Sequence, residues 1–568
     1  MTEPVGQAEE VERVEGVEGV EGVEGVEGVE GVEGVEGVEG VEEPVIVAAA
    51  RQIAEGIVAA APEGWTEAVL AASAGPGGLS YSGDYLVPGA AGRGIPVQAP
   101  FGELYLLSEG VRQARSWQRM TLELRCRPSG EHELIVSDDS LSSLRSSGDG
   151  FLAVLDDDYR LPEPGADQEP GTAAPAGDPA LAVAHFRAQL ERRAAILGRP
   201  DRLPPPASHS AIEAVERRLG HALPADLRAL YRIADGDEVD GRQGHLVGGY
   251  GWLSLAGMAA VHEHLSVPAW FGWDLGWNGV VLDADPPETV RRCGGHPAWL
   301  PFATGRDGNY LAVDLAPARD GRPGQVIRIG RDHDAGPQYV AESVTALFGR
   351  YADQLAAGAY EAEEEWIGLT GGAFGAGAPG RREIIGAIPA TVPSGLQALH
   401  VNDATGPVDL SPLAAAHRLR RLHLNRSVTA DLSPLRELPV ESLRVTLAGG
   451  DLTALAGHRT LRTLELATPA AEGPAAVDLS VLRAVPNVRG LDVSGAAVRD
   501  LTVLADLPEL RYLALNGRQW AELSAAGKIP AGLAAVRLAE REAPMAQALA
   551  WAAGFGLDTG GALRLRLR

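Results

Sequence analysis

The chain has 568 residues, of which 45% are hydrophobic, with a formal net charge of −28 and two cysteines. This length exceeds what one hydrophobic core supports, so we expect at least three folded units. The negative charge argues against nucleic acid and anionic membranes as partners, and two cysteines cannot form a disulfide framework. With no signal-peptide pattern and no apolar run long enough to span a bilayer, the expected location is the cytoplasm.

Residues 1–43 form a low-complexity segment. The triplet Val-Glu-Gly repeats nine times from Val14 to Gly40, and the segment contains fifteen Glu and one Arg. A period of three fits neither a helix nor a strand, and glutamates at every third position repel one another. We therefore expect a disordered acidic tail.

Residues 44–160 are predicted to form a small α+β domain. An apolar segment of helix-forming residues, Val45–Ala60, is followed by Ala61-Pro-Glu-Gly-Trp65. A hairpin signal comes next, with two alternating segments around a turn: Trp117–Cys126, Pro128-Ser-Gly130 and Glu131–Val136. This order of a helix, a Pro-x-x-Trp motif and a Trp-led hairpin resembles the YezG-like family of small bacterial immunity proteins.

A linker with five prolines, residues 161–180, precedes the middle domain, residues 181–358. Apolar residues from Ile212 to Tyr231 are spaced as two amphipathic helices around a Pro-broken turn. This segment, followed by Asp235-Gly236, is similar to the first part of the domain of the SUKH superfamily. That superfamily includes fungal cell-wall assembly regulators and many bacterial immunity proteins. Later segments fit its remaining strands and closing helix: Trp299–Ala303, Asp307–Asp314, Gly324–Ile329 and Ala341–Phe348. The resemblance implies an α+β fold and neutralisation of a protein toxin by stoichiometric binding.

Within the middle domain, Trp270, Trp273 and Trp277 alternate with glycines. Aromatic residues gathered on a loop are typical of binding hot spots. Large aromatic residues also dominate hydrophobic cores, so these side chains could instead cover the sheet. Both interpretations stay open, and we take the three tryptophans as candidate protein-binding residues.

After a Glu- and Gly-rich linker, residues 359–384, the segment 385–540 is repetitive. An apolar-x-x-apolar-x-apolar pattern recurs in steps of 21 to 27 residues. Its copies begin at Leu396, Leu419, Val440, Leu461, Val488, Leu510 and Leu533. This period indicates a leucine-rich-repeat solenoid of α/β type, and the segment resembles the internalin-like repeats of bacteria.

In each repeat the leucines at alternate positions are expected to face the core, which turns the residues between them to the opposite face. Thus Leu422 and Leu424 should point inward, and Arg421 and His423 outward. The central outward column is predicted to contain His400, His423, Arg444, Glu465, Asp492, Ala514 and Arg537. Its mixed charge argues against nucleic acid. We predict a protein-binding surface, and the alternative is an ordinary solvated face.

The last segment, residues 541–568, is predicted to close the final coil. Pro544–Phe555 has the composition of a short helix, and Ala562–Leu567 alternates as a strand. Solenoids need such a cap because the last coil would otherwise expose its leucines.

The sequence contains no motif of a catalytic site. G-x-x-x-x-G-K-[ST], H-E-x-x-H and G-x-S-x-G are all missing, and Cys293, His262, His264 and His296 lack zinc-ligand spacing. We therefore expect no catalytic residues, no metal and no cofactor. The predicted function is a non-enzymatic immunity protein that binds a protein toxin. The alternative is a regulatory scaffold that recruits housekeeping partners, and the oligomeric state stays open.

Overall fold

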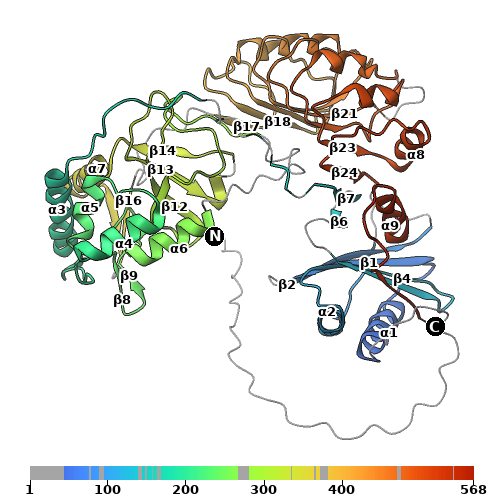
Figure 1. Ribbon diagram of the computed structural model, residues 1–568, viewed down its shortest axis with the longest axis horizontal. Helices are drawn as coiled ribbons and strands as arrows, with labels where there is room; N and C mark the ends of the chain where they lie inside the picture. The colour runs from blue at the N-terminus through green and yellow to red at the C-terminus, as the bar shows by residue number, and fades with distance from the viewer. Residues whose placement is uncertain are drawn as a thin grey trace, which may run out of the picture.

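The structure is a computed structural model of the chain. It describes residues 44–75, 78–88, 95–138, 144–147, 150–156, 158–160, 162, 165, 168–265, 280–333, 335–363, 366–370, 382–469, 475–540 and 543–567. The predicted acidic tail, residues 1–43, and the glycine-rich part of the predicted linker lie outside the described residues. Figure 1 shows a mixed helix and sheet multidomain chain, in which a repeat array stands between two α+β domains.

The N-terminal domain is a six-stranded sheet with two helices on one face (Figure 1). Its elements are α1 (Pro44–Ala59), β1 (Glu67–Gly75), β2 (Gly78–Leu86), β3 (Ile95–Pro96), α2 (Phe101–Arg115), β4 (Met120–Cys126) and β5 (His132–Asp138). The predicted hairpin is β4–β5, with Cys126 opposite His132. Alternate residues of β1 are buried against the helices, as period-two alternation requires for a sheet with one covered face.

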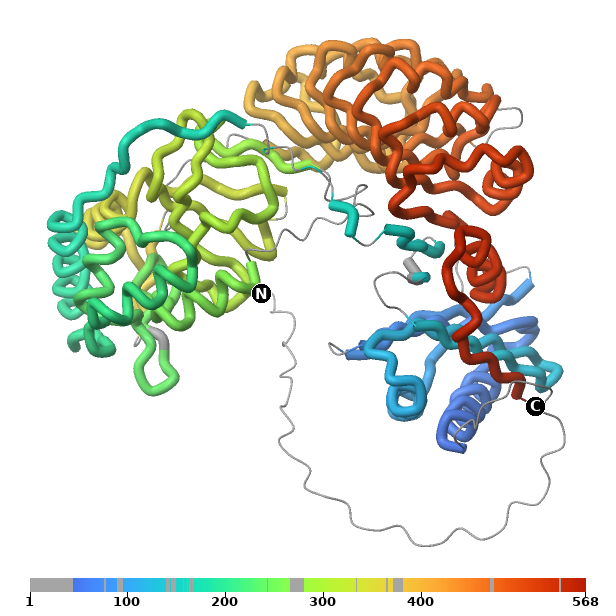
Figure 2. The backbone as a smooth tube through the Cα atoms, viewed as in Figure 1, coloured from blue at the N-terminus to red at the C-terminus, as the bar shows by residue number. Residues whose placement is uncertain are grey.

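The sixth strand of this sheet comes from the other end of the chain. The strand β25 (Leu563–Leu567) pairs antiparallel with β5, and its three leucines join the core of the N-terminal domain. The prediction that this strand caps the last coil is wrong, because its alternating leucines complete the core of the N-terminal sheet instead. The preceding helix α9 (Met545–Ala553) does pack on the core of the repeat array. Figure 2 shows this final segment running from the array onto the N-terminal sheet.

The middle domain contains a five-stranded antiparallel sheet, of order β10-β11-β12-β13-β14, with helices packed against it. Its elements are α3 (Pro179–Leu197), α4 (His209–Leu219), α5 (Ala225–Tyr231), β8 (Glu238–Val239), β9 (Arg242–Gln243), β10 (Gly251–Trp252), α6 (Leu255–Leu265), β11 (Trp299–Thr304), β12 (Asn309–Asp314), β13 (Gln325–Gly330), β14 (Gln338–Ala341) and α7 (Val344–Ala356). The two predicted amphipathic helices correspond to α4 and α5. The Ser208 side chain caps α4 by accepting the Ala211 N–H.

Two segments predicted as linkers make contacts of their own. The hairpin of β15 (Tyr360–Ala362) and β16 (Ile367–Leu369) follows α7, and Leu369 packs against the core of the middle domain. The chain before α3 also lies on this domain, where the Gly171 N–H donates to the Pro317 carbonyl at 3.1 Å. Within the described residues, we find no helix that is both long and apolar enough to cross a bilayer.

The repeat array is built on parallel strands in chain order, one that precedes the first repeat and one from each of the seven repeats. The strands are β17 (Glu383–Ile385), β18 (Ala398–Asn402), β19 (Arg421–Thr429), β20 (Ser442–Leu447), β21 (Thr463–Ala467), β22 (Gly490–Asp492), β23 (Tyr512–Leu515) and β24 (Ala535–Leu538). The helix α8 (Gly517–Ala525) follows β23, and five repeats carry a 3-10 turn: Ser411–Ala415, Ser433–Leu435, Thr453–Leu455, Leu479–Ala484 and Leu501–Asp506. The recurring Asp-Leu-Ser/Thr step opens these turns, because the Asp409 carboxylate accepts the Ser411 N–H at 2.9 Å and later repeats do the same.

The far end of the array is closed by a hairpin from the N-terminal half of the chain. The strands β6 (Leu144–Ser147) and β7 (Gly150–Val154) extend the sheet beyond β24, and Phe151 and Ala153 join the leucine core. The edge of β24 is therefore paired with β7, and the short strand β6 is the outermost strand at this end of the sheet.

Candidate protein-binding surface

The positions predicted to form one outward column do lie opposite one another on successive strands. The paired residues are His400, His423, Arg444, Glu465, Asp492, Ala514 and Arg537. One residue of each repeat takes the same register, so the sequence period fixes this alignment. We call this row the charged column. Its alignment agrees with the sequence, and its role in protein binding stays a prediction.

Two neighbouring charges of the column, Arg444 and Glu465, form an ion pair. The Arg444 Nε atom lies 2.6 Å from Glu465 Oε2, and these side chains are 31% and 44% exposed. Asp492 is half-buried, and its carboxylate accepts the Ser494 N–H at 3.0 Å. A half-exposed ion pair adds little stability, but it gives a partner a defined pattern of charge to match.

His423 faces outward as predicted, but it is buried by its neighbours and not solvated. Its side chain does lie on the outward face, where the His400 ring packs edge-on at 5.1 Å and Ser442 Oγ lies 3.0 Å from Nε2. Burial, with further contributions from Arg444, Arg421 and His400, lowers the pKa of His423 to about 2. The imidazole is therefore neutral at physiological pH and acts as a packed polar group.

A second row of polar residues, which the sequence analysis missed, lies immediately before the strands. The row consists of Gln397, Arg420, Glu441, Arg462, Arg489 and Arg511. From Arg420 onward, the backbone N–H of each residue donates to the carbonyl of the row residue before it. We call this the rim row. A signal for it was present in the sequence, because a polar or charged residue directly follows the first apolar residue of six consecutive repeats.

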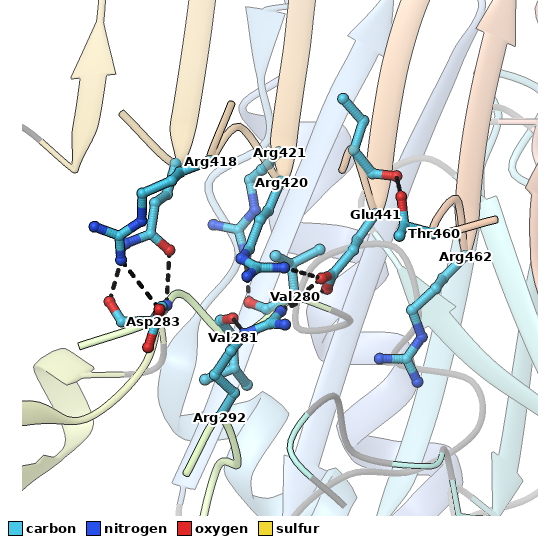
Figure 3. A network of polar contacts seen from close by, with 12 residues as sticks. Val280, Val281, Asp283, Arg292, Arg418, Arg420, Arg421, Glu441, Thr460 and Arg462 are labelled. Atoms are coloured by element: carbon cyan, nitrogen blue, oxygen red, sulfur yellow. Dashed lines mark hydrogen bonds and ion pairs between the residues drawn. The ribbon is translucent and has the colours of Figure 1, made fainter. Parts of the chain in front are cut away.

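The rim row holds a segment of the middle domain, Val280–Arg292, which we call the docked segment (Figure 3). Arg292 Nη2 donates to both carboxylate oxygens of Glu441, at 2.7 and 2.8 Å. Arg420 Nη1 donates to the same carboxylate at 2.7 Å. The side chains of Arg292 and Glu441 are only 8% and 6% exposed. Burial lowers the pKa of Arg292, and the Glu441 carboxylate opposes that shift.

The array also binds the backbone of the docked segment. The Gln397 side chain accepts the Asp283 N–H at 2.7 Å and donates to the Asp283 carbonyl at 3.0 Å. Arg421 donates to the Val280 carbonyl at 3.0 Å, and Arg418 donates to the Asp283 carboxylate at 3.1 Å. Arg421 points away from the leucine core as predicted, and the docked segment buries it.

Three aliphatic side chains complete the contact. Val280 and Leu282 pack in one cluster with Ala398 of β18. Val281 packs in another cluster with residues of β23 and β24: Tyr512, Ala514 and Ala535. Burial raises the pKa of Tyr512 to about 12, so its hydroxyl stays protonated. The docked segment thus covers part of the array's outward face, where it contacts β18, β23 and β24.

The rim row also contacts the chain that leads from β7 to the middle domain. Arg462 Nη2 donates to the Pro162 carbonyl, and Arg489 Nη1 lies 3.4 Å from the Tyr159 hydroxyl. The Gly165 N–H then donates to the Arg292 carbonyl at 2.8 Å. The same row of side chains therefore fixes both the docked segment and the chain leading to the middle domain.

The remaining candidates are placed as follows. Trp270, Trp273 and Trp277 lie outside the described residues, so their predicted role in binding is untested. Trp252 is a core residue that packs 5.1 Å from the Tyr231 ring. Across the part of the chain that the structure describes, no group of three His, Cys, Asp or Glu side chains is arranged to hold a metal ion.

Comparison with known proteins identifies the middle domain. Residues 206–350 match the model of the SMI1 / KNR4 family (SUKH-1). This segment of the chain is a SUKH-1 domain. The match covers about a quarter of the 568 residues, in agreement with the resemblance drawn from the two helices and the later strands.

The curated relatives are fungal. A glucan synthesis regulatory protein of Neurospora crassa is 39% identical over 83 residues, which are 15% of each chain. The cell wall assembly regulator SMI1 of Saccharomyces cerevisiae is 40% identical over 73 residues, 13% of this chain and 14% of the relative. The cell wall biosynthesis/cell cycle regulator smi1 of Schizosaccharomyces pombe is 31% identical over 169 residues, 28% of this chain and 32% of the relative. The chain thus spans about a third or less of the length of these relatives.

Among solved structures, an internalin of Listeria monocytogenes is similar to this chain, with 24% identity. The match covers 25% of this chain and 44% of the internalin, with a TM-score of 0.20.

Proposed function

We propose that this chain is a non-enzymatic regulatory scaffold of the cytoplasm. In this proposal the repeat array is a leucine-rich-repeat solenoid of the internalin-like type, and its charged column binds a protein partner beside the SUKH-1 domain. The observation that carries the proposal is the aligned column on a sheet to which the SUKH-1 domain is fixed by the buried Arg292–Glu441 pair. The relatives that share this domain are named as regulators of the cell wall, which supports a regulatory role.

Affinity capture with full-length variants tests the scaffold. We expect the wild-type protein to retain a reproducible set of partners from the native host's lysate, and R444A/E465A to retain them at least ~10-fold less. The control is R436A/E437A, which also removes one Arg and one Glu, from exposed positions beside a 3-10 turn. Equal recovery by both double variants would contradict a role for the charged column.

Toxin neutralisation is the second candidate, and the net charge of −28 favours it. An acidic protein attracts a basic target such as a nuclease toxin through electrostatic complementarity, and that attraction weakens as salt rises. Recovery of one dominant toxin-like protein, with an affinity that falls steeply with salt, would support this function. Recovery of several housekeeping proteins would favour the scaffold.

A further inference from the structure

We propose that the part of the array's outward face under the docked segment is a binding site for a peptide segment of a protein partner. The docked segment Val280–Arg292 occupies this site as an internal ligand. The inference rests on the proposed function for the existence of a partner, and it adds both the chemistry of that partner and a means of regulating its access.

The contacts to the backbone are those of a peptide-binding site. Val280 to Ala284 form neither helix nor strand, so their backbone groups need partners other than one another. The array supplies three of these partners from side chains, since Gln397 binds both the N–H and the carbonyl of Asp283, and Arg421 binds the Val280 carbonyl. The middle domain supplies two others, because the Leu282 N–H donates to the Ala335 carbonyl and Arg292 donates to the Val281 carbonyl. Contacts of this kind depend on the backbone and not on its side chains, so another segment with the same backbone conformation can use them.

The side-chain contacts define which segment fits. The array presents small residues where the aliphatic side chains sit, with Ala398 beside Val280 and Leu282. Arg418 then receives the Asp283 carboxylate at 3.1 Å. Glu441 receives the guanidinium of Arg292, nine positions further along the chain. The partner segment therefore has consecutive aliphatic residues, an acidic residue directly after them and, beyond a turn, a basic residue that lies back against the aliphatic residues.

The internal ligand is bound specifically but not strongly. A buried ion pair gains little net stability, because desolvation of both charges offsets their attraction. Two buried guanidinium nitrogens at this contact, Arg420 Nε and Arg462 Nη1, also have no hydrogen-bond partner. Interfaces between domains of one chain that are this polar resemble transient protein–protein interfaces. A partner segment can therefore compete for the site.

A labelled peptide with the sequence of residues 280–292, Val-Val-Leu-Asp-Ala-Asp-Pro-Pro-Glu-Thr-Val-Arg-Arg, tests the proposal by fluorescence anisotropy. Full-length wild-type protein is compared with R292A and D283N, which weaken the internal ligand and leave the array unchanged. Because the tethered segment competes at high effective concentration, we expect the peptide to bind either variant at least ~10-fold more tightly than wild type. The matched control is R319A, which removes an exposed arginine of the same domain and should bind as wild type does.

A second peptide, carrying V281D, checks that binding is specific. It should lose affinity for both variants, because it places a charge among Tyr512, Ala514 and Ala535. Equal binding of the first peptide to wild type, R292A and D283N, or equal binding of the two peptides, would overturn the proposal. D283N is nearly isosteric and decides the test if R292A fails to fold, as judged by its thermal transition.

The scaffold proposal and the peptide-site proposal can be rejected independently of each other. If R444A/E465A retains its captured partners while the peptide still distinguishes D283N from wild type, the charged column is dispensable and the peptide site stands. If capture depends on the column while the peptide binds all proteins equally, the internal ligand is rejected and the scaffold stands.

Discussion

Two guanidinium groups at the contact between the SUKH-1 domain and the array share one carboxylate. Glu441 accepts from both Arg292 and Arg420, and Arg462 adds a further positive charge nearby. Guanidinium groups are favourable inside a protein only where acceptors offset their lost hydration. The arrangement is therefore sensitive to loss of Glu441 in a way that the exposed ion pairs of the same array are not.

We predict that E441Q lowers the free energy of unfolding by about 3 kcal/mol, because Arg292 stays buried without its carboxylate. Urea denaturation followed by circular dichroism measures this change. The control is D506N, which breaks the half-exposed Arg483–Asp506 pair and should cost about 0–1 kcal/mol. An E441Q protein as stable as D506N would show that the buried pair contributes no more than a surface pair.

His423 gives the array a stability that depends on pH. Its pKa is lowered from 6.5 to about 2 in the folded chain, so below pH 6.5 the unfolded chain binds a proton at this residue that the folded chain does not. Stability should therefore fall with decreasing pH. Between pH 6.5 and 5 we expect wild type to lose about 2 kcal/mol more than H423Q.

Urea titrations of both proteins at the two pH values check this prediction. H417Q, at an exposed histidine of the same array, serves as the control and should lose stability as wild type does. Parallel losses in wild type and H423Q would exclude His423 as the cause.

Among the elements, β25 makes the connection that is least local in sequence. Its leucines at 563, 565 and 567 are buried in the N-terminal core, and its arginines at 564 and 566 are exposed. A strand with this alternation can pair with the edge strand of any sheet that has one face buried in a core. The open edge here is β5, whose residues Leu134 and Val136 lie opposite Leu565 and Leu563.

We predict that L565A destabilises the N-terminal domain by about 2–4 kcal/mol, through lost burial and the cavity left behind. R564A, on the exposed face of the same strand, should cost less than about 0.5 kcal/mol. Hydrogen exchange of β5 amides measures the effect at the paired strand. Unchanged protection of β5 in L565A would mean that the strand pairing does not stabilise this sheet.

In the whole molecule, the N-terminal domain, the middle domain and the array are held together by non-covalent contacts as well as by the connecting chain. The strand β7 pairs with the last strand of the array, and β25, which follows the array, joins the N-terminal sheet (Figure 1). The rim row of the array binds the docked segment of the middle domain (Figure 3). Together these contacts connect the part of the chain before residue 371 to the part after residue 381 without using the chain between them.

We therefore predict that the two parts stay together after the chain is cut. A protease site inserted between residues 371 and 381 would yield two fragments that co-elute in size-exclusion chromatography, because β24–β7 and β25–β5 pairing persists. Addition of L565A and E441Q to the cut protein should promote separation. Fragments that separate without these substitutions would contradict the paired arrangement.

The features that each repeat encodes within its own residues, such as its strand and its buried leucines, could be predicted from the sequence. The repeat period places Leu422 and Leu424 in the core and aligns Arg444 with Glu465, because each repeat carries its own strand and turn signals. The docked segment could not be predicted this way, since Val280–Arg292 has no periodicity and gains its conformation from side chains more than 100 residues away. The partner of β25 was missed for a similar reason, because alternation predicts a strand but not the edge it joins.

The pairing of β25 with β5 also sets an order of events during protein synthesis. The N-terminal sheet begins with Glu67, but its sixth strand is made only when the ribosome has reached residue 567. The sheet that contains Glu67 is thus completed only after the array has been made, and its β5 edge stays open to other chains until then.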